Sequence, residues 1–441
     1  MKRLLSLLLC AVLALFCATT AQAAGVSITL TASEYALHYA FDAGAQDPFV
    51  ILEYTTPAEK GWMMLYSEDG HFEGDVSLAY SGTGGKTSVA LTSARTTGSI
   101  GKASTTLPKA ADYQKPTGKS NAKVMDFVLT ETPEGFHYAF NAIGTDYMLL
   151  YWRSKEQTVT QPVYPDENGH YEGDVISDLT FARTQFTVQV KSGSGSMKKE
   201  ATVRKGYQAP EAPQRQEGRL SGVTVCIDAG HQENGRFVNE PIGPGLTGST
   251  SGKGGMAQGT KTNRRESIVC LEIGMLLRDE LLRQGANVIM TREDQTTFHT
   301  NIERCEIAEA GGAQIMLRLH CNNSSNRSKR GIQVYGPLNS DYAKAVADAD
   351  TYREMGQKLL EAMKTRVGMT LANSTGMVRL NDHYVGNNWA KMMCFLVEMG
   401  YLSNPAEEYL LVTPVYQQWL AEGMADGVYE IAVARGWVQA Q

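Results

Sequence analysis

The chain has 441 residues, of which 42% are hydrophobic and 20% are charged, a composition typical of globular protein and long enough for two or three domains. Its formal net charge is −6 and its isoelectric point is about 5.8. This acidic balance lacks the clustered positive charge of nucleic-acid-binding proteins, so we expect no nucleic-acid partner.

The first 23 residues have the pattern of a secretory signal peptide. Lys2 and Arg3 precede an apolar run, Leu4–Cys17, and residues 21–23 have the small-x-small spacing of a cleavage site. The apolar run has 14 residues, which is short for a bilayer span, and no later segment has 18 consecutive apolar residues. We expect a secreted, extracytoplasmic protein, at a cell wall or in a periplasm, with no transmembrane segment in the mature chain. The alternative is a retained membrane anchor.

Two sequence motifs occur twice in the region that follows. HYAF is found at His38–Phe41 and His137–Phe140, and GHFEGDV at Gly70–Val76 returns as GHYEGDV at Gly169–Val175. Both pairs are offset by 99 residues (137 − 38 and 170 − 71). A shared offset of this kind indicates a tandem duplication.

Each copy contains short runs rich in Tyr, Val, Thr and Phe, broken by Gly, Asp and Asn. This pattern predicts two β-sandwich-like modules, residues 25–108 and 120–205. We expect the stretch Thr96–Thr106 to belong to turns and to the connection between modules, and the repeated His71 and His170 to mark a turn. The modules either bind a glycan or surface-protein ligand or act as a spacer, and the sequence favours neither.

A polar linker is predicted at residues 206–220, which contain Pro210 and Pro213. Residues 221–438 then alternate between buried strands and helices, which predicts an α/β domain with a mainly parallel sheet flanked by helices. The predicted strands are VTVCIDAG, NVIMTR, IMLRLHC, GIQVYG and MMCFLVEMG, and the predicted helices are Glu266–Arg283, Asn301–Ala310, Asp341–Arg366 and Val415–Arg435. The fold class is therefore multidomain, with two small all-β sandwich modules before an α/β catalytic domain.

Five cysteines follow the predicted signal peptide, and all lie in this last domain. Their odd number and the lack of a Cys-x-x-Cys pair argue against a disulfide framework. We expect small buried thiols. They are Cys226, Cys270, Cys305, Cys321 and Cys394.

Three polar residues, His231, His320 and Glu398, each end an apolar run. Ligands of open α/β sheets bind beyond the carboxyl ends of the strands, so we expect these side chains at one rim. Glu266 opens the helix that follows the long loop 232–265. A zinc hydrolase needs three ligands of the His, Asp or Glu type and a carboxylate that moves a proton, and these residues can supply that set.

Other roles for some of these residues remain open at this stage. Glu266 could instead be a charge favoured at a helix N-terminus, and Glu398 a strand-end carboxylate paired with Arg or Lys. His299 and His383 lie in polar stretches and are expected to face solvent or stabilise loops. Glu272 and Glu280 are expected to point away from the rim.

Four stretches, in this order, resemble the zinc-dependent N-acetylmuramoyl-L-alanine amidases. They are Ile227–His231, Arg264–Arg292, Asn301–Asn322 and Phe395–Glu408. The resemblance covers about half of the chain. It implies that His231, Glu266 and His320 bind one Zn²⁺ and that Glu398 is the catalytic residue. The implied substrate is peptidoglycan, cut at the amide between N-acetylmuramic acid and L-alanine.

Two rival functions remain. One is another zinc peptidase or amidohydrolase that acts within the stem peptide, and the other is a non-catalytic wall-binding scaffold. The chain also departs from the usual family pattern twice. Loop 232–265 is much longer and resembles a variant with Glu-Pro-Ile-x-Pro-Gly, expected to line the substrate groove. Arg318 stands where the family usually has Ser, two residues before His320 and on the same sheet face.

Overall fold

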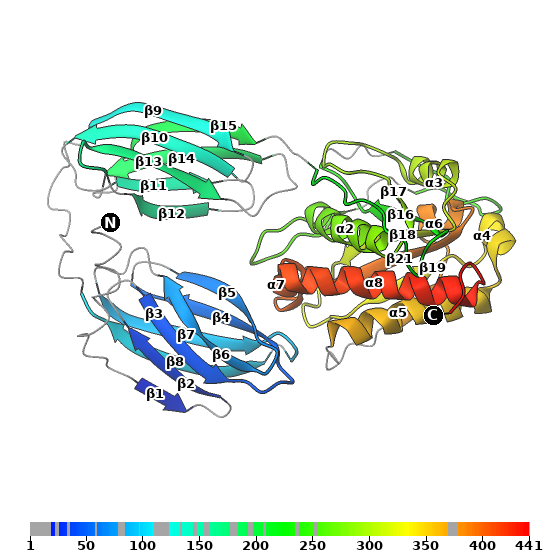
Figure 1. Ribbon diagram of the computed structural model, residues 1–441, viewed down its shortest axis with the longest axis horizontal. Helices are drawn as coiled ribbons and strands as arrows, with labels where there is room; N and C mark the ends of the chain where they lie inside the picture. The colour runs from blue at the N-terminus through cyan, green and yellow to red at the C-terminus, as the bar shows by residue number, and fades with distance from the viewer. Residues whose placement is uncertain are drawn as a thin grey trace.

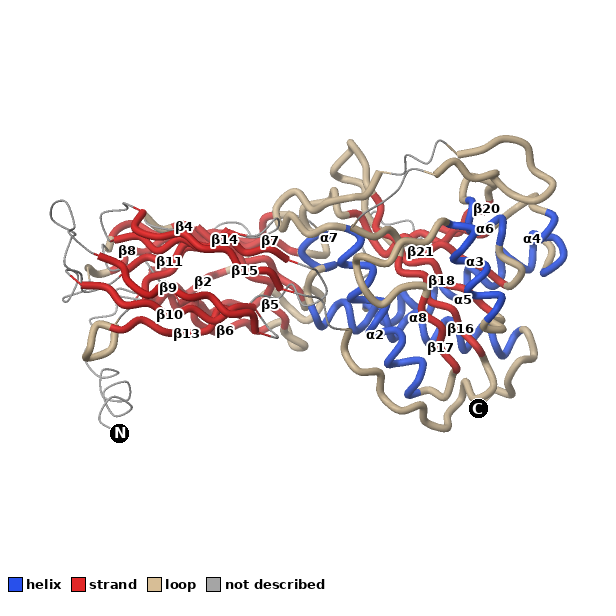
Figure 2. Tube along the Cα trace, turned by 90° about the horizontal axis from the view of Figure 1, so that it is seen from above, coloured by secondary structure: helices blue, strands red, loops and turns tan. Residues whose placement is uncertain are grey.

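The computed structural model describes most of the chain from Thr19 to Ala440. The residues outside the description are 1–18, 23–25, 33–35, 58–59, 78–83, 97, 110–122, 133–134, 144–147, 154–157, 164, 177–183, 193–196, 206–208, 234–237, 251–254, 369–376 and 441. Most of the predicted signal peptide therefore lies outside the described residues. Figure 1 and Figure 2 show two β-sandwiches at one end of the molecule and an α/β domain at the other.

The first sandwich consists of two antiparallel sheets, in the orders β1-β2-β3-β6 and β5-β4-β7-β8. Its side chains alternate between the shared core and the surface, as in Ala36–Asp42, because successive residues of a strand point to opposite faces. The strands are β1 Thr19–Gln22, β2 Ser27–Ala32, β3 Ala36–Asp42, β4 Phe49–Thr55, β5 Lys60–Tyr66, β6 His71–Ser77, β7 Gly85–Ser93 and β8 Ser99–Leu107.

The second sandwich repeats this plan with sheets β13-β10-β9 and β12-β11-β14-β15. Its core gathers aromatic rings, including Phe136, Phe140 and Tyr171. The strands are β9 Lys123–Thr132, β10 Gly135–Ile143, β11 Met148–Arg153, β12 Thr158–Val163, β13 His170–Ile176, β14 Thr184–Ser192 and β15 Met197–Lys205.

Two local predictions about the modules were wrong. Most of Thr96–Thr106, which was predicted to form turns and the connection between modules, is strand β8. Its small residues Gly101, Ala103 and Thr105 face the core of the sandwich. His71 and His170 do not form a turn but are the first residues of β6 and β13. The turns are made by the preceding Gly70 and Gly169, whose φ angles are 83° and 79°.

The six-stranded sheet of the C-terminal domain has the order β17-β16-β18-β21-β19-β20. Neighbouring strands are parallel except that β19 runs antiparallel to β21. The fold class is therefore the predicted one. The strands are β16 Thr224–Ala229, β17 Asn287–Met290, β18 Ile315–Asn322, β19 Gln333–Gly336, β20 Met377–Leu380 and β21 Met393–Tyr401.

Helices cover both faces of this sheet. Helices α2, α5 and α8 share one apolar core with residues such as Ile227 and Phe395, whereas α3 and α6 cover Cys226 and Cys394 on the other face. The helices are α2 Glu266–Arg283, α3 Asn301–Ala310, α4 Asp341–Val346, α5 Ala349–Val367, α6 Val385–Trp389, α7 Glu407–Leu411 and α8 Pro414–Ala434. No helix in the described part of the chain is both long enough and apolar enough to cross a bilayer.

The single helix predicted over Asp341–Arg366 is in fact two. The backbone is extended at Ala347, and Asp348 then caps α5 by accepting a hydrogen bond from the Thr351 amide at 2.8 Å. The five predicted thiols are all buried and free, as expected.

The first module packs directly against the α/β domain. Phe49 is 1% exposed. Its ring centroid lies 5.2 Å from that of Trp419 and 5.9 Å from that of Tyr416, both on α8. Trp62 lies 4.2 Å from the Tyr409 ring of α7. The first module is thus fixed to the catalytic domain by an aromatic interface.

Phe49→Ala should destabilise this interface by about 3–5 kcal/mol, because a large buried aromatic side chain is lost. The free energy of unfolding, measured by denaturant titration with a probe on the C-terminal domain, tests this. Val128→Ala is the control, because Val128 is 55% exposed. A change below about 1 kcal/mol for Phe49→Ala would contradict the interface.

Candidate active site

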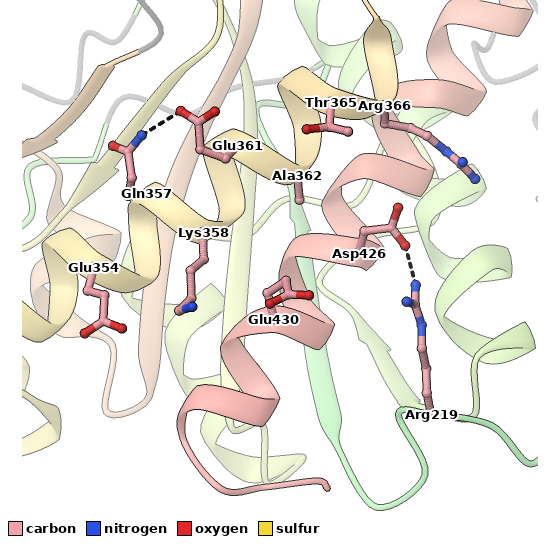
Figure 3. Close-up of a pocket in the computed structure, with 10 residues that line it drawn as sticks. All are labelled: Arg219, Glu354, Gln357, Lys358, Glu361, Ala362, Thr365, Arg366, Asp426 and Glu430. Atoms are coloured by element: carbon pink, nitrogen blue, oxygen red, sulfur yellow. Dashed lines mark hydrogen bonds and ion pairs between the residues drawn. The ribbon is translucent and has the colours of Figure 1, made fainter. Parts of the chain in front are cut away.

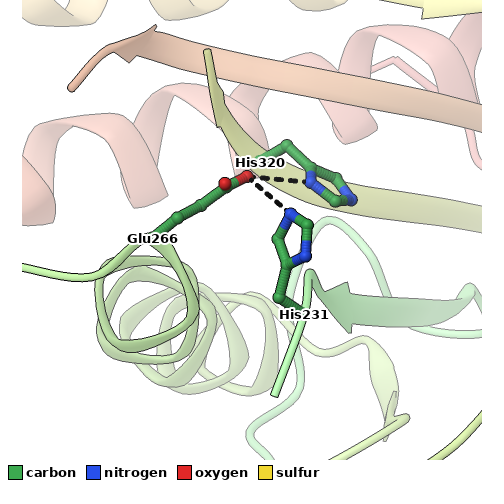
Figure 4. Close-up of side chains that lie close together, drawn as sticks. All are labelled: His231, Glu266 and His320. Carbon is green, nitrogen blue, oxygen red and sulfur yellow. Dashed lines mark hydrogen bonds and ion pairs between the residues drawn. The ribbon is translucent and has the colours of Figure 1, made fainter. Parts of the chain in front are cut away.

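Three side chains from separate elements meet at the carboxyl edge of the sheet. His231 follows β16, Glu266 begins α2 and His320 lies near the end of β18. Glu266 Oε1 is 3.0 Å from His320 Nδ1 and 3.1 Å from His231 Nε2 (Figure 4). One potential ligand atom from each residue lies within 4.8 Å of the others. The structure thus brings together the three predicted metal-ligating residues.

Glu266 is held in place by backbone groups as well as by the histidines. Its Oε2 accepts a hydrogen bond from the Ala257 amide at 2.7 Å, and its Oε1 accepts one from the Cys321 amide at 3.0 Å. Burial would raise the pKa of Glu266, but hydrogen bonds and charge interactions with His231 and His320 lower it far below its usual range. The side chain is therefore an anion, which is the form in which a carboxyl group binds a metal.

The two imidazoles are positioned differently. Burial is the largest influence on the pKa of His320 and lowers it, against the opposing effect of Glu266, so the neutral form that binds metals is favoured. His231 has a φ of 58°, a conformation that costs a non-glycine residue about 1–3 kcal/mol. The surrounding structure must therefore hold His231 in a strained backbone conformation.

Buried arginines supply that support. Arg304 donates hydrogen bonds to the carbonyls of His231 at 3.3 Å and Ala229 at 3.0 Å, and Arg292 donates to Gly230 at 2.8 Å. Asp228 is 0% exposed and balances this positive charge. The sequence motifs alone did not indicate these residues. A carboxylate inside the apolar strand VCIDA was the signal that could have found them, because a buried charge requires a partner.

Glu398 stands beside the cluster, directly opposite His320 in the register between β18 and β21. Burial, followed by the negative charge of Glu266, raises the pKa of Glu398 to about 8. A carboxylate with a raised pKa next to a hydrolytic centre can both accept and return a proton near neutral pH.

The donor set fits a zinc ion. Zinc accepts imidazole nitrogens and carboxylate oxygens and leaves one position for water in catalytic sites. Within the described residues, the buried atoms Nε2 of His320 and Oε2 of Glu398 have no hydrogen-bond partner in the protein. Two unsatisfied polar atoms at one site indicate that a ligand belongs there.

The other candidate residues do not join this cluster. His299 and His383 are outside it, and His383 is exposed. Glu272 instead binds Arg264 at 2.6 Å, and Glu280 binds Gln284 and Arg283. A surface hollow between α5 and α8 is lined mostly by charged side chains and contains none of the four site residues (Figure 3).

Comparison with known proteins agrees with this geometry. The family described as N-acetylmuramoyl-L-alanine amidase matches residues 225–430. A germination-specific N-acetylmuramoyl-L-alanine amidase of Bacillus subtilis is 26% identical over 231 residues, 49% of this chain and 83% of that protein. The probable cell wall amidase LytH of Staphylococcus aureus is 26% identical over 218 residues, and this match covers 48% of the present chain and 60% of LytH.

Among solved structures, an N-acetylmuramoyl-L-alanine amidase from Clostridium difficile is 23% identical, with a TM-score of 0.38, and the match covers 48% of this chain and 96% of that one. The family match spans the sheet, α2 and all four residues of the site. Residues 225–430 therefore form a domain that matches the N-acetylmuramoyl-L-alanine amidase family.

Proposed function

We propose that this protein hydrolyses the amide between N-acetylmuramic acid and the L-alanine of the peptidoglycan stem peptide. The observation that carries the proposal is the convergence of His231, Glu266 and His320 next to Glu398 at one edge of the sheet. The family acts on the cell wall, so the site of action is extracytoplasmic.

In this proposal His231, Glu266 and His320 hold one zinc ion. When bound, zinc supplies Lewis-acid activation of the attacking water and of the scissile carbonyl. Glu398 accepts the proton of that water as the carbon–oxygen bond forms. The same carboxyl group then donates the proton to the departing nitrogen of L-alanine as the carbon–nitrogen bond breaks. The products are a lactyl carboxylate on the glycan and a free stem peptide.

A pair of soluble substrates separates this proposal from a stem-peptide peptidase. The zinc-loaded full chain should cleave N-acetylmuramyl tripeptide at the L-alanine amide and leave the same tripeptide without muramic acid intact. A peptidase that cuts between amino acids would cleave both. Failure to cleave either, by a chain that binds zinc, would favour the wall-binding scaffold.

The β modules carry a surface that favours a binding role. The outer face of β3 and β6 is nearly the same in both copies. The outward-facing positions of β7, which are exposed or half-buried, differ in the second copy (Lys86 and Gln185, Ser88 and Thr187, Ala90 and Gln189). The shared positions are His38 and His137, Ala40 and Ala139, His71 and His170, Glu73 and Glu172, and Asp75 and Asp174. Residues at outward-facing positions are expected to differ between two copies of a module unless a function retains them. We therefore propose that this face binds a wall glycan or a surface protein.

The double variant His71→Ala/His170→Ala should weaken binding to insoluble peptidoglycan by about tenfold or more, equivalent to about 1.4 kcal/mol, because a polar contact is lost in each module. Cosedimentation measures this binding. Ser88→Ala/Thr187→Ala changes the other outer face and is the matched control. Cleavage of the soluble muramyl peptide should stay unchanged in both. Equal sedimentation of the two double variants would favour the spacer.

A further inference from the structure

Residues 238–250 of the long loop are held by helices α4 and α6. The indole nitrogen of Trp389 donates a hydrogen bond to the Pro241 carbonyl at 2.8 Å, and the Asn388 side chain donates to the Ile242 carbonyl at 3.1 Å. The backbone amide of Asp341 donates to the Pro244 carbonyl at 3.0 Å. These contacts come from α6 and from the start of α4, so this part of the loop is held in place against the two helices.

Glu240 is the buried charge of this segment, with 5% exposure. One of its oxygens accepts a hydrogen bond from the Ile302 amide at 2.8 Å, and the other accepts from the side chain of Asn301 at 2.7 Å and its amide at 3.2 Å. The carboxylate therefore binds the first turn of α3, where unpaired amides and the helix dipole favour an anion.

Asn301 connects Glu240 to the unusual Arg318. Its amide nitrogen donates to Glu240, and its amide oxygen accepts a hydrogen bond from Arg318 Nη2 at 2.6 Å. Arg318 is 3% exposed, and its Nε donates to Asp228 at 3.0 Å. Close packing fixes the guanidinium, since a Cβ on Gly386 would lie 2.3 Å from Arg318 Cζ.

The path ends at the strained metal-ligating residue. Asp228 pairs with Arg304, and Arg304 donates to the carbonyl of His231. The links from Glu240 to His231 are hydrogen bonds and ion pairs, buried at Asp228 and part-buried elsewhere. Hydrogen bonds to charged groups are strong, and leaving such a group unpaired in the interior is costly. The two departures from the family pattern, the long loop and Arg318, thus meet in one network.

From this network we infer that Glu240 and Arg318 are positioning residues that couple the anchored loop to the backbone of His231. The segment that carries Glu240 is anchored to α3, α4 and α6. Arg318 stabilises Asp228 and, through it, the arginine that holds His231 at a φ of 58°. The inference rests on the proposed role of His231 as a zinc ligand, but not on which amide bond is cut.

The test compares three variants of the full chain: Glu240→Gln, Arg318→Lys and Asn301→Ala. Lysine keeps the charge but loses the planar fork that contacts Asp228 and Asn301 together. The Asn301 variant removes the bridge and leaves both charges. Zinc affinity, measured by competition with a chromogenic chelator, should fall about 10- to 100-fold in each, as for other residues that orient metal ligands. Hydrogen exchange of the amides at residues 229–231 should speed up in parallel.

Glu280→Gln is the matched control, because Glu280 is a similarly buried carboxylate at the far end of α2. It should leave zinc affinity unchanged. The effects of Glu240→Gln and Arg318→Lys should be less than additive in the double variant, since both break one network. If the Glu240→Gln or Arg318→Lys chain shows no cooperative thermal transition, that variant is not folded, and the Asn301→Ala chain then provides the test.

The inference would be overturned if a folded Asn301→Ala chain had a zinc affinity and amide exchange rates within twofold of the wild-type values. If the variants lose zinc affinity as expected but the wild-type chain cleaves no muramyl peptide, the coupling stands and the proposed function fails. The two claims are therefore separable.

Discussion

Replacing Glu398 with Gln should lower kcat by about 10²- to 10⁴-fold, the usual contribution of a general acid–base group. The amide keeps the shape of the side chain but cannot accept the proton of the attacking water. Zinc affinity should change little, because Glu398 is not among the three residues proposed to hold the metal. Steady-state cleavage of N-acetylmuramyl tripeptide, together with zinc titration of the same sample, measures both quantities.

The control for this variant is Glu272→Gln, which alters a buried carboxylate of α2 that binds Arg264 and Gln417 away from the cluster. Its kcat should remain near that of the wild type. A Glu398→Gln chain that is folded, binds zinc and retains more than about a tenth of the wild-type kcat would exclude Glu398 as the proton carrier.

Removing the metal should abolish activity and destabilise the C-terminal domain. A ligand that binds only the folded state stabilises it by about 4.1 kcal/mol at a free concentration 1,000 times its Kd. For a domain of this size, each kcal/mol shifts Tm by about 2–4 °C, so a chelator should lower Tm by about 8–16 °C. Thermal unfolding, followed with and without chelator, gives this difference, and added zinc should restore both activity and Tm.

His320→Ala should reproduce the loss of activity without any chelator, because the variant lacks one of the three proposed zinc ligands. His383→Ala changes an exposed histidine of the same domain and should behave as the wild type. If the chelator left activity and Tm unchanged while wild-type protein contained no other tightly bound metal, the proposed zinc centre would be wrong.

Elements with long, regular patterns could be predicted from the sequence. Helices Glu266–Arg283 and Asn301–Ala310 have the bounds that the apolar spacing indicated. The convergence of His231, His320 and Glu398 followed from one rule, that parallel strands end at the same edge of a sheet. Glu266 was less certain, because a carboxylate at a helix start is also explained by the helix dipole alone.

Short elements and tertiary networks could not be predicted in this way. The break at Ala347 and Asp348 interrupts a sequence that is otherwise helical, and helix α7 has only five residues. The arginines that hold His231 come from the turn after β17 (Arg292) and from α3 (Arg304), and they reach it only after folding brings distant segments together. Arg318 was noticed as a departure from the family, but its partners Asp228 and Asn301 are 90 and 17 residues away in the sequence.

The packing of the first module against the α/β domain also could not be predicted from the sequence. Phe49, Trp62 and Tyr66 fit the pattern of ordinary strand residues, but they face α7 and α8 and not the core of their own sandwich. A period of two predicts that alternate residues share a face, not which face meets another domain.

Mass spectrometry of the products from purified peptidoglycan, incubated with the zinc-loaded full chain and in parallel with Glu398→Gln, tests the proposed activity most directly. We expect intact stem peptides with a new L-alanine amino terminus and glycan strands free of peptide, from the wild-type chain alone. Products cut between two amino acids of the stem, with L-alanine still attached to muramic acid, would contradict it.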